Sequence, residues 1–417
     1  MYQAPRGTTD ILPQEQRYWR YVERRAVAVC QRFGYQRIDT PLFEAAGLFV
    51  RSVGEDTDIV EKETYTFQDR GGDELTLRPE GTAPVCRAYL EQGMHNLPQP
   101  VRLYYFCPIF RYERPQAGRY RQHHQFGIEA IGDGDPLIDV EVIQIGWTLL
   151  QELELQSMSL VVNSIGDPEC RPGYHQRLRE YYRGHLDHLC DDCRRRFDRN
   201  PLRLLDCKKE SCQPYIAEAP RSADHLCAPC REHWDAVTGQ LDNLEIPYRV
   251  DHRLVRGLDY YSRTVFEIQP PEEGSQSTIL GGGRYDGLIQ ELGGRPTPGV
   301  GFGSGMERII VNLKKQQVKV PPEMPRPVVV VALGDAARIF GVKLAASLRS
   351  GGLSILVAPG NRSLKSQLRY ASSMDARYAL IVGDEELQRG VVGVRDMDRG
   401  EQRQLAEADL PTVLQDS

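Results

Sequence analysis

The sequence lacks any long apolar run, and its first residues lack a basic segment followed by an apolar one. No stretch approaches the ~20 consecutive apolar residues that a membrane-spanning helix needs, and a secretory signal would need the missing pattern. An excess of one charge is also absent, because 52 Lys and Arg stand against 58 Asp and Glu, for a net charge of −6. This balance excludes a strongly basic nucleic-acid coat protein, although it allows a local basic face. We therefore expect a cytoplasmic protein without membrane contact.

The length of 417 residues exceeds what one ordinary hydrophobic core supports, so we expect two or three domains. Four prolines between residues 321 and 327 mark a linker. After this linker, buried-strand patterns alternate with helical ones, which is the βαβ rhythm of a small α/β domain. The strands are predicted at residues 328–333, 353–358 and 378–382, and the helices at residues 336–349 and 364–374.

An arginine-rich stretch at residues 101–132 predicts a β-hairpin. Its outer segments, 101–110 and 126–131, are rich in aromatic and β-branched residues, as strands are. Pro115 and Gly118 favour a loop between them. The simplest alternative is an exposed hairpin whose polar face only meets water.

Side chains on this hairpin suggest a ligand. Strand alternation puts Gln125, Gly127 and Glu129 on one face, where the glycine would leave room for a bound molecule. One guanidinium group can donate two parallel hydrogen bonds to the oxygens of a phosphate, so a cluster of arginines suits a polyphosphate. The cluster comprises Arg111, Arg114, Arg119 and Arg121.

Residues 76–83 allow two interpretations. Thr82 could be the N-cap of a helix that starts at Ala83, after a turn. Alternatively, Glu80 and Thr82 offer a carboxylate and a hydroxyl group to a cationic amine. The local sequence favours the first interpretation and leaves the second open.

Two further segments could line a pocket. Arg256 lies beside Gly257, Asp259 and two tyrosines, which suits a pocket wall but also a loop whose tyrosines pack on the core. The glycine-rich segment 299–305 precedes a helix that contains Arg308, and such a junction can bind phosphate. Arg308 in the first turn opposes the helix dipole, which a bound anion would compensate.

Six of the ten cysteines lie between residues 190 and 230, in a region at about 170–246 that reads as a mostly helical insertion. Cys190-x-x-Cys193 and Cys227-x-x-Cys230 are typical of a tetrahedral site in which four thiolates bind zinc. The 33 residues between the two pairs exceed the usual spacing. The alternative is a set of reduced, partly buried cysteines that bind no metal.

Four segments together resemble the motifs of class II histidyl-tRNA synthetases. Residues 40–44, 110–129, 254–261 and 299–308 match motif 1, motif 2, the histidine-specific motif LVRGLDYY and motif 3. The resemblance implies an α+β fold: a class II antiparallel sheet flanked by helices in residues 1–325, with the helical insertion, and an α/β anticodon-binding domain in 326–417. It implies that ATP activates histidine as the adenylate, with Mg²⁺ on the phosphates, before transfer to tRNA(His). Motif 1 implies a homodimer.

The resemblance also implies roles for individual residues. Arg111 and Arg256 would act in catalysis at the α-phosphate. The ATP-binding positions are Arg111, Glu113, Arg121 and Arg308, and the histidine-binding positions are Glu80, Thr82, Gln125, Glu129, Tyr260, Tyr261 and Tyr285. His123 departs from the family pattern, which more often has an aromatic residue there. The rival interpretation is the synthetase-like regulatory subunit of ATP phosphoribosyltransferase, which lacks the anticodon domain and has a degraded histidine motif.

Overall fold

The computed structural model describes residues 2–53, 63–113, 120–271, 278–322, 325–360 and 362–415. The chain forms two compact units, Met1–Val320 and Pro321–Ser417, which divide at the proline-rich segment. Among the described residues, no helix is both long and apolar enough to cross a bilayer.

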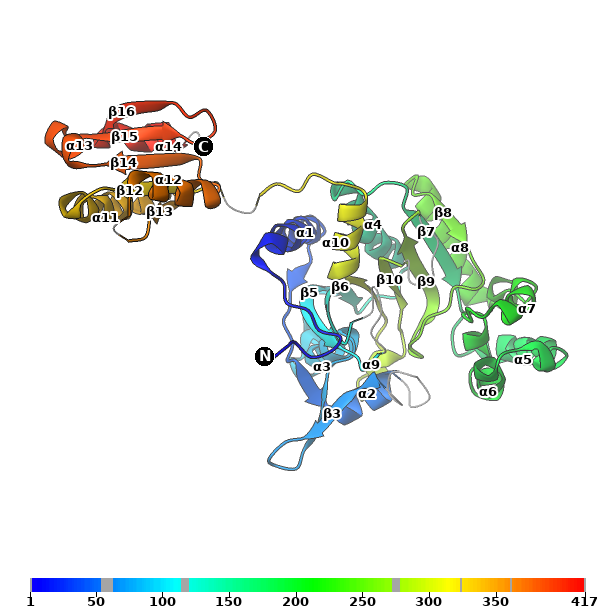
Figure 1. The fold of residues 1–417 in the computed structure, drawn as a ribbon. Helices are drawn as coiled ribbons and strands as arrows, with labels where there is room; N and C mark the ends of the chain where they lie inside the picture. The colour runs from blue at the N-terminus through cyan, green and yellow to red at the C-terminus, as the bar shows by residue number, and fades with distance from the viewer. Residues whose placement is uncertain are drawn as a thin grey trace. The chain divides into compact units, whose positions relative to one another are not determined.

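A mixed sheet is the centre of the first unit (Figure 1). Among the described residues it has eight strands, and the pairs β1–β5 and β7–β8 are parallel while the other neighbours are antiparallel. In spatial order the strands are β1 (Gln36–Arg37), β5 (Val101–Phe110), β6 (Gln122–Ile131), β11 (Gly299–Gly305), β10 (Leu280–Arg284), β9 (Ser262–Gln269), β7 (Ser159–Ser164) and β8 (Tyr248–Val250). The predicted hairpin is confirmed, although its second strand begins four residues earlier than expected.

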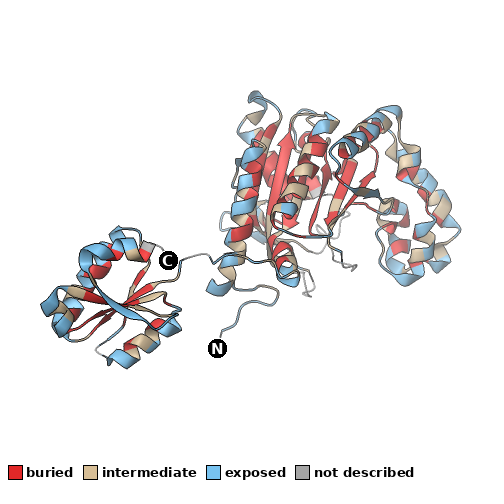
Figure 2. Ribbon diagram, turned by 90° about the horizontal axis from the view of Figure 1, so that it is seen from above, coloured by how far each residue is buried: buried red, intermediate tan, exposed pale blue. Residues whose placement is uncertain are grey.

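Alternation along β5 and β6 divides the core between the two sheet faces. Phe126, Ile128 and Ala130 pack in one cluster with helices α1 (Pro13–Arg32), α4 (Pro136–Glu152), α8 (Ala228–Asn243) and α10 (Met306–Lys315). Tyr105 and Ile109 belong to the cluster on the other face. Figure 2 shows buried residues concentrated in the strands and on the inner sides of the helices. This unit also contains α2 (Ala46–Val53), α3 (Thr82–Glu91) and α9 (Leu288–Glu291).

The predicted helical insertion is present, with α5 (Arg171–Arg183), α6 (Asp191–Arg199) and α7 (Gln213–Ala217) preceding α8. Tyr174, Leu178 and Tyr182 on α5 are buried together with Phe197 on α6. The insertion therefore has apolar contacts of its own.

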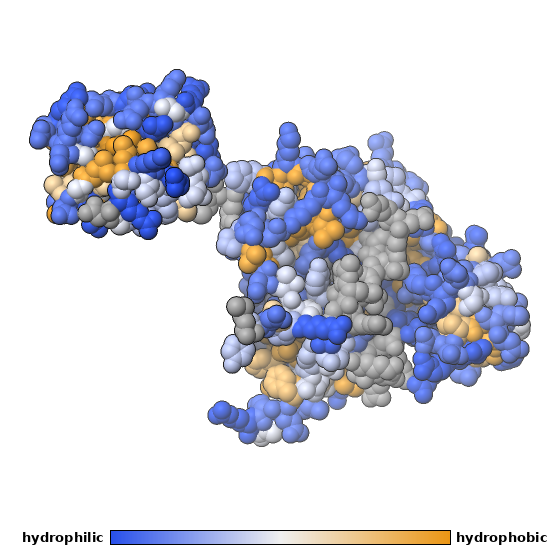
Figure 3. Space-filling view, in the orientation of Figure 1, coloured by the Kyte–Doolittle hydropathy of each residue, from blue (hydrophilic) through white to orange (hydrophobic). Residues whose placement is uncertain are grey.

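A small antiparallel sheet carries exposed apolar side chains. It comprises β2 (Phe43–Ala45), β4 (Glu74–Leu77) and β3 (Tyr65–Gln68) in that order. Leu42, Phe43 and Phe67 are 47%, 49% and 43% exposed. Figure 3 shows hydrophobic side chains at the surface beside β3.

The second unit contains the predicted α/β alternation. Its described strands have the order β13 (Ile355–Val357), β12 (Val328–Ala332), β14 (Tyr378–Val382), β15 (Val391–Asp396) and β16 (Gln402–Ala406). The first three are parallel and were expected, whereas the antiparallel β15 and β16 were not. Helices α11 (Asp335–Ser350) and α12 (Leu364–Ser373) follow β12 and β13, and α13 (Asp384–Arg389) and α14 (Leu410–Gln415) complete the unit.

A buried ion pair joins the sheet of the first unit to its helices. The Arg284 side chain on β10 and the Asp139 side chain on α4 are both 0% exposed, and Arg284 Nε donates to Asp139 Oδ2 at 3.0 Å. His233 on α8 contacts the same carboxylate at 3.1 Å. Burial alone would raise the pKa of Asp139, but the charge of Arg284 and the hydrogen bonds from His233 and Arg284 lower it to about 2.

Replacing Arg284 with Met should lower the free energy of unfolding of this unit by about 3–5 kcal/mol, because Asp139 would lose the main partner of its buried charge. All three tryptophans of the chain lie in this unit, so their fluorescence during urea unfolding reports its stability. Arg177→Met is the control, since Arg177 pairs with Glu180 at an exposed helix surface and should change the midpoint little. Equal midpoints for the two variants would contradict the role of Arg284.

Candidate active site

A cavity of about 1140 Å³ brings together residues from distant parts of the first unit. Strands β6, β10 and β11, the start of α10 and the insertion all contribute to its lining. Nine of the twelve residues predicted for the site line it: Glu80, Thr82, Arg111, Glu113, Gln125, Arg256, Tyr260, Tyr261 and Arg308. Arg121, Glu129 and Tyr285 are not among the lining residues.

The pairing of β6 with β11 positions two of the predicted residues. Glu129 lies opposite Gly301, and Gln125 lies opposite Gly305 with Gly303 two residues away. A Cβ atom on Gly301 would lie 2.0 Å from Glu129 Oε2, and one on Gly303 would lie 2.4 Å from Gln125 Nε2. The glycine-rich strand therefore makes space for protein side chains, which is a different use from the predicted phosphate platform.

Glu129 is fully buried and accepts three hydroxyl hydrogen bonds. Thr82 Oγ1 donates to Oε1 at 2.8 Å, Tyr105 Oη donates to the same oxygen at 3.1 Å, and Tyr285 Oη donates to Oε2 at 2.5 Å. Burial raises the pKa of Glu129 to about 8, although these hydrogen bonds oppose the shift. The carboxyl group therefore lies behind the cavity wall, in contact with Thr82 on the wall itself.

Tyr105 fills the space beside Gly127, where the sequence predicted room for a ligand. A Cβ atom on Gly127 would lie 2.3 Å from the Tyr105 ring, so the glycine is needed for the tyrosine and the prediction was wrong on this point. Tyr105 Oη also accepts a hydrogen bond from Gln125 Nε2 at 3.2 Å, which connects Gln125 to Glu129. Tyr105 was missed because its contact depends on the register that pairs it with Gly127.

Glu80 accepts hydrogen bonds from the start of α3, which is the capping role that the sequence predicted for the Thr82 side chain. Its carboxylate accepts the backbone N–H groups of Thr82 and Ala83, each at 2.7 Å, at the start of α3. The prediction of Thr82 as the N-cap was therefore wrong, because the Thr82 hydroxyl donates to Glu129 instead. Burial raises the pKa of Glu80.

Arg78 holds the segment that carries Glu80 and Thr82. Its buried guanidinium group donates to the carbonyl oxygens of Thr40 and Pro108, each at 2.9 Å, and of Pro41 at 3.1 Å. The residues before β2, the segment before α3 and strand β5 are thereby connected at one point. No role was predicted for Arg78.

Arg256 is held at the cavity by a carboxylate that the sequence did not indicate. Arg256 Nη1 donates to Glu267 Oε1 at 2.6 Å, and its guanidinium carbon lies 5.5 Å from the centre of the Tyr261 ring. Thr278 donates to the other oxygen of Glu267 at 2.6 Å. A Cβ atom on Gly281 would lie 2.6 Å from Arg256 Nη1, so this glycine also makes space for a side chain.

Two more arginines and a histidine line the cavity. Arg111 Nε donates to the Pro79 carbonyl oxygen and Arg308 Nη1 to that of Thr278, both at 2.7 Å. Burial, followed by the charges of Arg111 and Arg308, lowers the pKa of His123 to about 3. His123 is therefore neutral at pH 7, so it adds no positive charge to these arginines.

Arg121 lies over the Tyr112 ring, with 3.9 Å between its guanidinium carbon and the ring centre. Its backbone N–H donates to the Gly7 carbonyl oxygen at 2.7 Å, which attaches the N-terminal segment to β6. Arg114 and Arg119 of the predicted cluster lie outside the described residues.

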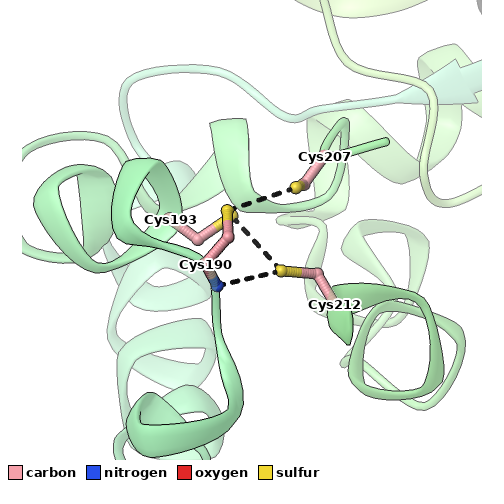
Figure 4. A group of neighbouring side chains, drawn as sticks. All are labelled: Cys190, Cys193, Cys207 and Cys212. Carbon is pink, nitrogen blue, oxygen red and sulfur yellow. Dashed lines mark hydrogen bonds between the residues drawn. The ribbon is translucent and has the colours of Figure 1, made fainter. Parts of the chain in front are cut away.

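The predicted four-cysteine zinc site is wrong, because the two Cys-x-x-Cys pairs belong to different groups. Cys190 and Cys193 lie with Cys207 and Cys212 (Figure 4), whereas Cys227 and Cys230 lie with Asp167 and Cys170. Within each group the potential ligand atoms are all within 4.8 Å of one another. The sequence pairing failed because it joined the two Cys-x-x-Cys pairs, whereas the fold brings Cys207 and Cys212 to Cys190 and Cys193.

Comparison with known proteins identifies the family. The sequence profile described as Histidyl-tRNA synthetase matches residues 7–169 and 176–309, and the one described as Anticodon binding domain matches residues 327–417. The chain belongs to the histidyl-tRNA synthetase family. This membership confirms the resemblance, and with it the class II fold and the C-terminal α/β anticodon-binding domain.

Similar proteins cover the chain from end to end. A histidine–tRNA ligase of Dehalococcoides mccartyi is 57% identical over 99% of this chain and 97% of its own length. One from Desulforamulus reducens is 50% identical over 97% of each chain. The apo histidyl-tRNA synthetase of S. aureus has a solved structure that is 36% identical, with a TM-score of 0.84 over 99% of this chain and all of its own.

Glu129 should give the stability of the first unit a distinct pH dependence. Its folded pKa is raised, so the folded protein favours the protonated form, and stability falls as pH rises from the ordinary pKa of 4.5 to about 8. We expect the unfolding free energy of wild type, relative to Glu129→Gln, to fall by up to about 1.4 kcal/mol per pH unit in this window. Urea unfolding followed by tryptophan fluorescence at pH 5, 6, 7 and 8 measures the difference, and parallel curves would contradict it.

Proposed function

We propose that the chain is a histidine–tRNA ligase, which activates histidine with ATP and transfers it to the 3′ end of tRNA(His). The observation that carries the proposal is one cavity that contains both a set of arginines and the polar groups of Glu80, Thr82 and Gln125. A relative that matches nearly the full length at 57% identity bears the name histidine–tRNA ligase, which supports this activity.

Arg111 and Arg256 are the proposed catalytic residues of the first step. A carboxylate oxygen of histidine attacks the α-phosphorus of ATP, so that a new P–O bond forms and the bond to pyrophosphate breaks. Negative charge grows on the non-bridging oxygens, and cations already in place lower the barrier. Arginine suits this role because it stays charged and presents two parallel donors. Glu267 supports the step by holding Arg256 at 2.6 Å before the substrate arrives.

The remaining ATP contacts are assigned to Glu113, Arg121 and Arg308, of which the first and last line the cavity. Arg308 would bind near the adenine and the γ-phosphate. Mg²⁺ would be held by Glu113 and Glu307, because both carboxylates line the cavity and this ion prefers oxygen ligands. The ion would supply further positive charge at the outer phosphates.

The histidine amino group is assigned to Glu80, Thr82 and Gln125, which share the cavity wall. The imidazole ring is assigned to Glu129 and Tyr261, and Tyr260 and Tyr285 complete the pocket. A neutral imidazole has one donor and one acceptor nitrogen, and an analogue that leaves a buried partner unpaired is rejected. Glu129 already accepts hydrogen bonds from three hydroxyl groups. If the imidazole ring binds to Glu129, its N–H would replace one of these donors.

The second unit favours this proposal over the regulatory-subunit alternative. Residues 327–417 match an anticodon-binding domain, which that subunit is expected to lack, and residues 254–261 retain the full histidine motif. A structure from Bacillus halodurans C, described as an ATP phosphoribosyltransferase regulatory subunit/histidyl-tRNA synthetase, is 21% identical with a TM-score of 0.64. This likeness concerns the fold alone.

A homodimer belongs to the proposal. Phe43 on β2 and Phe67 on β3, the two outer strands of the small sheet, are about half exposed, as is Leu42 just before β2. Leu42 and Phe43 belong to motif 1. A second copy bound at this face would remove their apolar surface from water, which stabilises association. The proposed location is the cytoplasm, where tRNA is charged for translation.

ATP–pyrophosphate exchange with each amino acid in turn tests the proposal. Histidine should be the amino acid that supports exchange, and the same preparation should charge tRNA(His). Arg256→Ala should lower kcat of this exchange by about 10²–10³-fold, because the transition state loses a fixed cation. Arg177→Ala, at an exposed surface of α5, is the control and should keep full activity. Exchange driven by another amino acid, or near-normal exchange by Arg256→Ala, would refute the assignment.

A further inference from the structure

The helical insertion contains four cysteine side chains that converge on one point (Figure 4). Cys190 and Cys193 come from the start of α6, Cys207 from the loop that follows it, and Cys212 from the turn Glu210–Cys212 before α7. All four are free thiols, and their sulfur atoms lie within 4.8 Å of one another.

The sulfur spacing matches a tetrahedral zinc site. The Sγ atoms of Cys190 and Cys207 are 3.7 Å apart, and those of Cys193 and Cys212 are 3.9 Å apart. Four sulfurs at about 2.3 Å from one zinc ion would be separated by about 3.8 Å along each edge of the tetrahedron. These two opposite edges lie on either side of that value, and all the sulfur separations are within 4.8 Å, so the four thiols are placed to surround one ion.

Backbone groups also point at these sulfurs. The N–H of Cys190 donates to Cys212 Sγ at 3.3 Å, and the N–H of Lys209 donates to Cys207 Sγ at 3.5 Å. Such donors stabilise the thiolate form, which is the form that binds metal. The pairs Cys190-x₂-Cys193 and Cys207-x₄-Cys212 also have the two to four intervening residues typical of zinc ligands.

We propose that Cys190, Cys193, Cys207 and Cys212 bind one Zn²⁺ ion as four thiolates. Binding forms four Zn–S bonds and releases the four thiol protons to solvent. Zinc fits better than magnesium or calcium because those ions require oxygen ligands.

The ion would crosslink α6 to the loop and turn that precede α7. This loop reaches the catalytic cavity, since Cys207, Lys208, Lys209 and Gln213 are among its lining residues. The proposed zinc site therefore fixes one wall of the cavity and the two lysines on it, although it lies outside the set of residues assigned to histidine and ATP.

Metal analysis of purified full-length protein tests the proposal. Mass spectrometry of the metal content should show that Cys207→Ser holds one zinc ion per chain fewer than wild type. After removal of zinc, wild type titrated with Co²⁺ should develop thiolate charge-transfer absorption and the visible bands of tetrahedral cobalt, and Cys207→Ser should not. Unfolding followed by tryptophan fluorescence checks that the variant is folded. Equal zinc content in folded wild type and variant overturns the proposal, as does iron in place of zinc.

The second cysteine group provides a matched background. Asp167 in that group already accepts the backbone N–H groups of Glu169 and Cys170, at 3.1 and 3.3 Å, and pairs with Arg263 at 3.4 Å. We therefore assign the ion to the first group alone. Cys207→Ser introduced into a Cys227→Ser protein should again remove one zinc ion. If the Cys227→Ser protein and the double variant contain the same amount of zinc, Cys227→Ser has already removed the ion that Cys207 binds. The two Cys-x-x-Cys pairs would then share one ion, and the assigned ligand set would be wrong.

Discussion

The pairing of β6 with β11 is the constraint on which the candidate site depends. Its register puts Glu129 opposite Gly301 and leaves Gly303 beside the Gln125 amide, so two polar side chains fit against backbone that has no Cβ atoms. A shift by one residue would turn Glu129 away from this face and expose Phe126 and Ile128 to the polar cavity. Strand β10 has the same arrangement, because the missing Cβ atom of Gly281 makes space for the Arg256 side chain. Glycine therefore makes space here for side chains of the candidate site.

The buried carboxyl groups of Asp139 in the core and Glu129 at the candidate site have different kinds of partner. In the core, Arg284 neutralises Asp139 directly, which keeps the carboxylate ionised and lowers its pKa to about 2. At the site, Glu129 has hydroxyl partners, and burial raises its pKa to about 8. A carboxyl group near its pKa can exchange partners and protons at modest cost, whereas a strong ion pair cannot. The first arrangement joins the sheet to the helices, and the second leaves a carboxyl group whose hydroxyl partners can be exchanged.

Local pattern predicted the elements of the fold and much of the site, because alternation and motif residues are properties of single segments. Strand alternation predicted that Gln125 and Glu129 lie on the same face of the sheet. Apolar runs predicted the alternating strands and helices of the C-terminal unit. Contacts between segments could not be read in this way. Tyr105 fills the space at Gly127 and Glu267 holds Arg256 only because of strand register, and Cys207 joins Cys190 through a folded turn.

We propose that glycines on β11 place the side chains that recognise histidine, and the variant Gly303→Ala probes this placement. The three atoms nearest to its added Cβ all belong to the flexible end of Gln125, the closest at 2.4 Å, so the strand itself is not expected to shift. Gly239→Ala on α8, where a Cβ atom meets nothing within 4 Å, is the matched control. In histidine-dependent pyrophosphate exchange, the KM for histidine should rise about tenfold or more in Gly303→Ala, because a hydrogen bond to a charged amino group is lost, while the KM for ATP stays constant. An unchanged KM for histidine in a folded Gly303→Ala protein would show that the space at Gly303 does not control histidine binding.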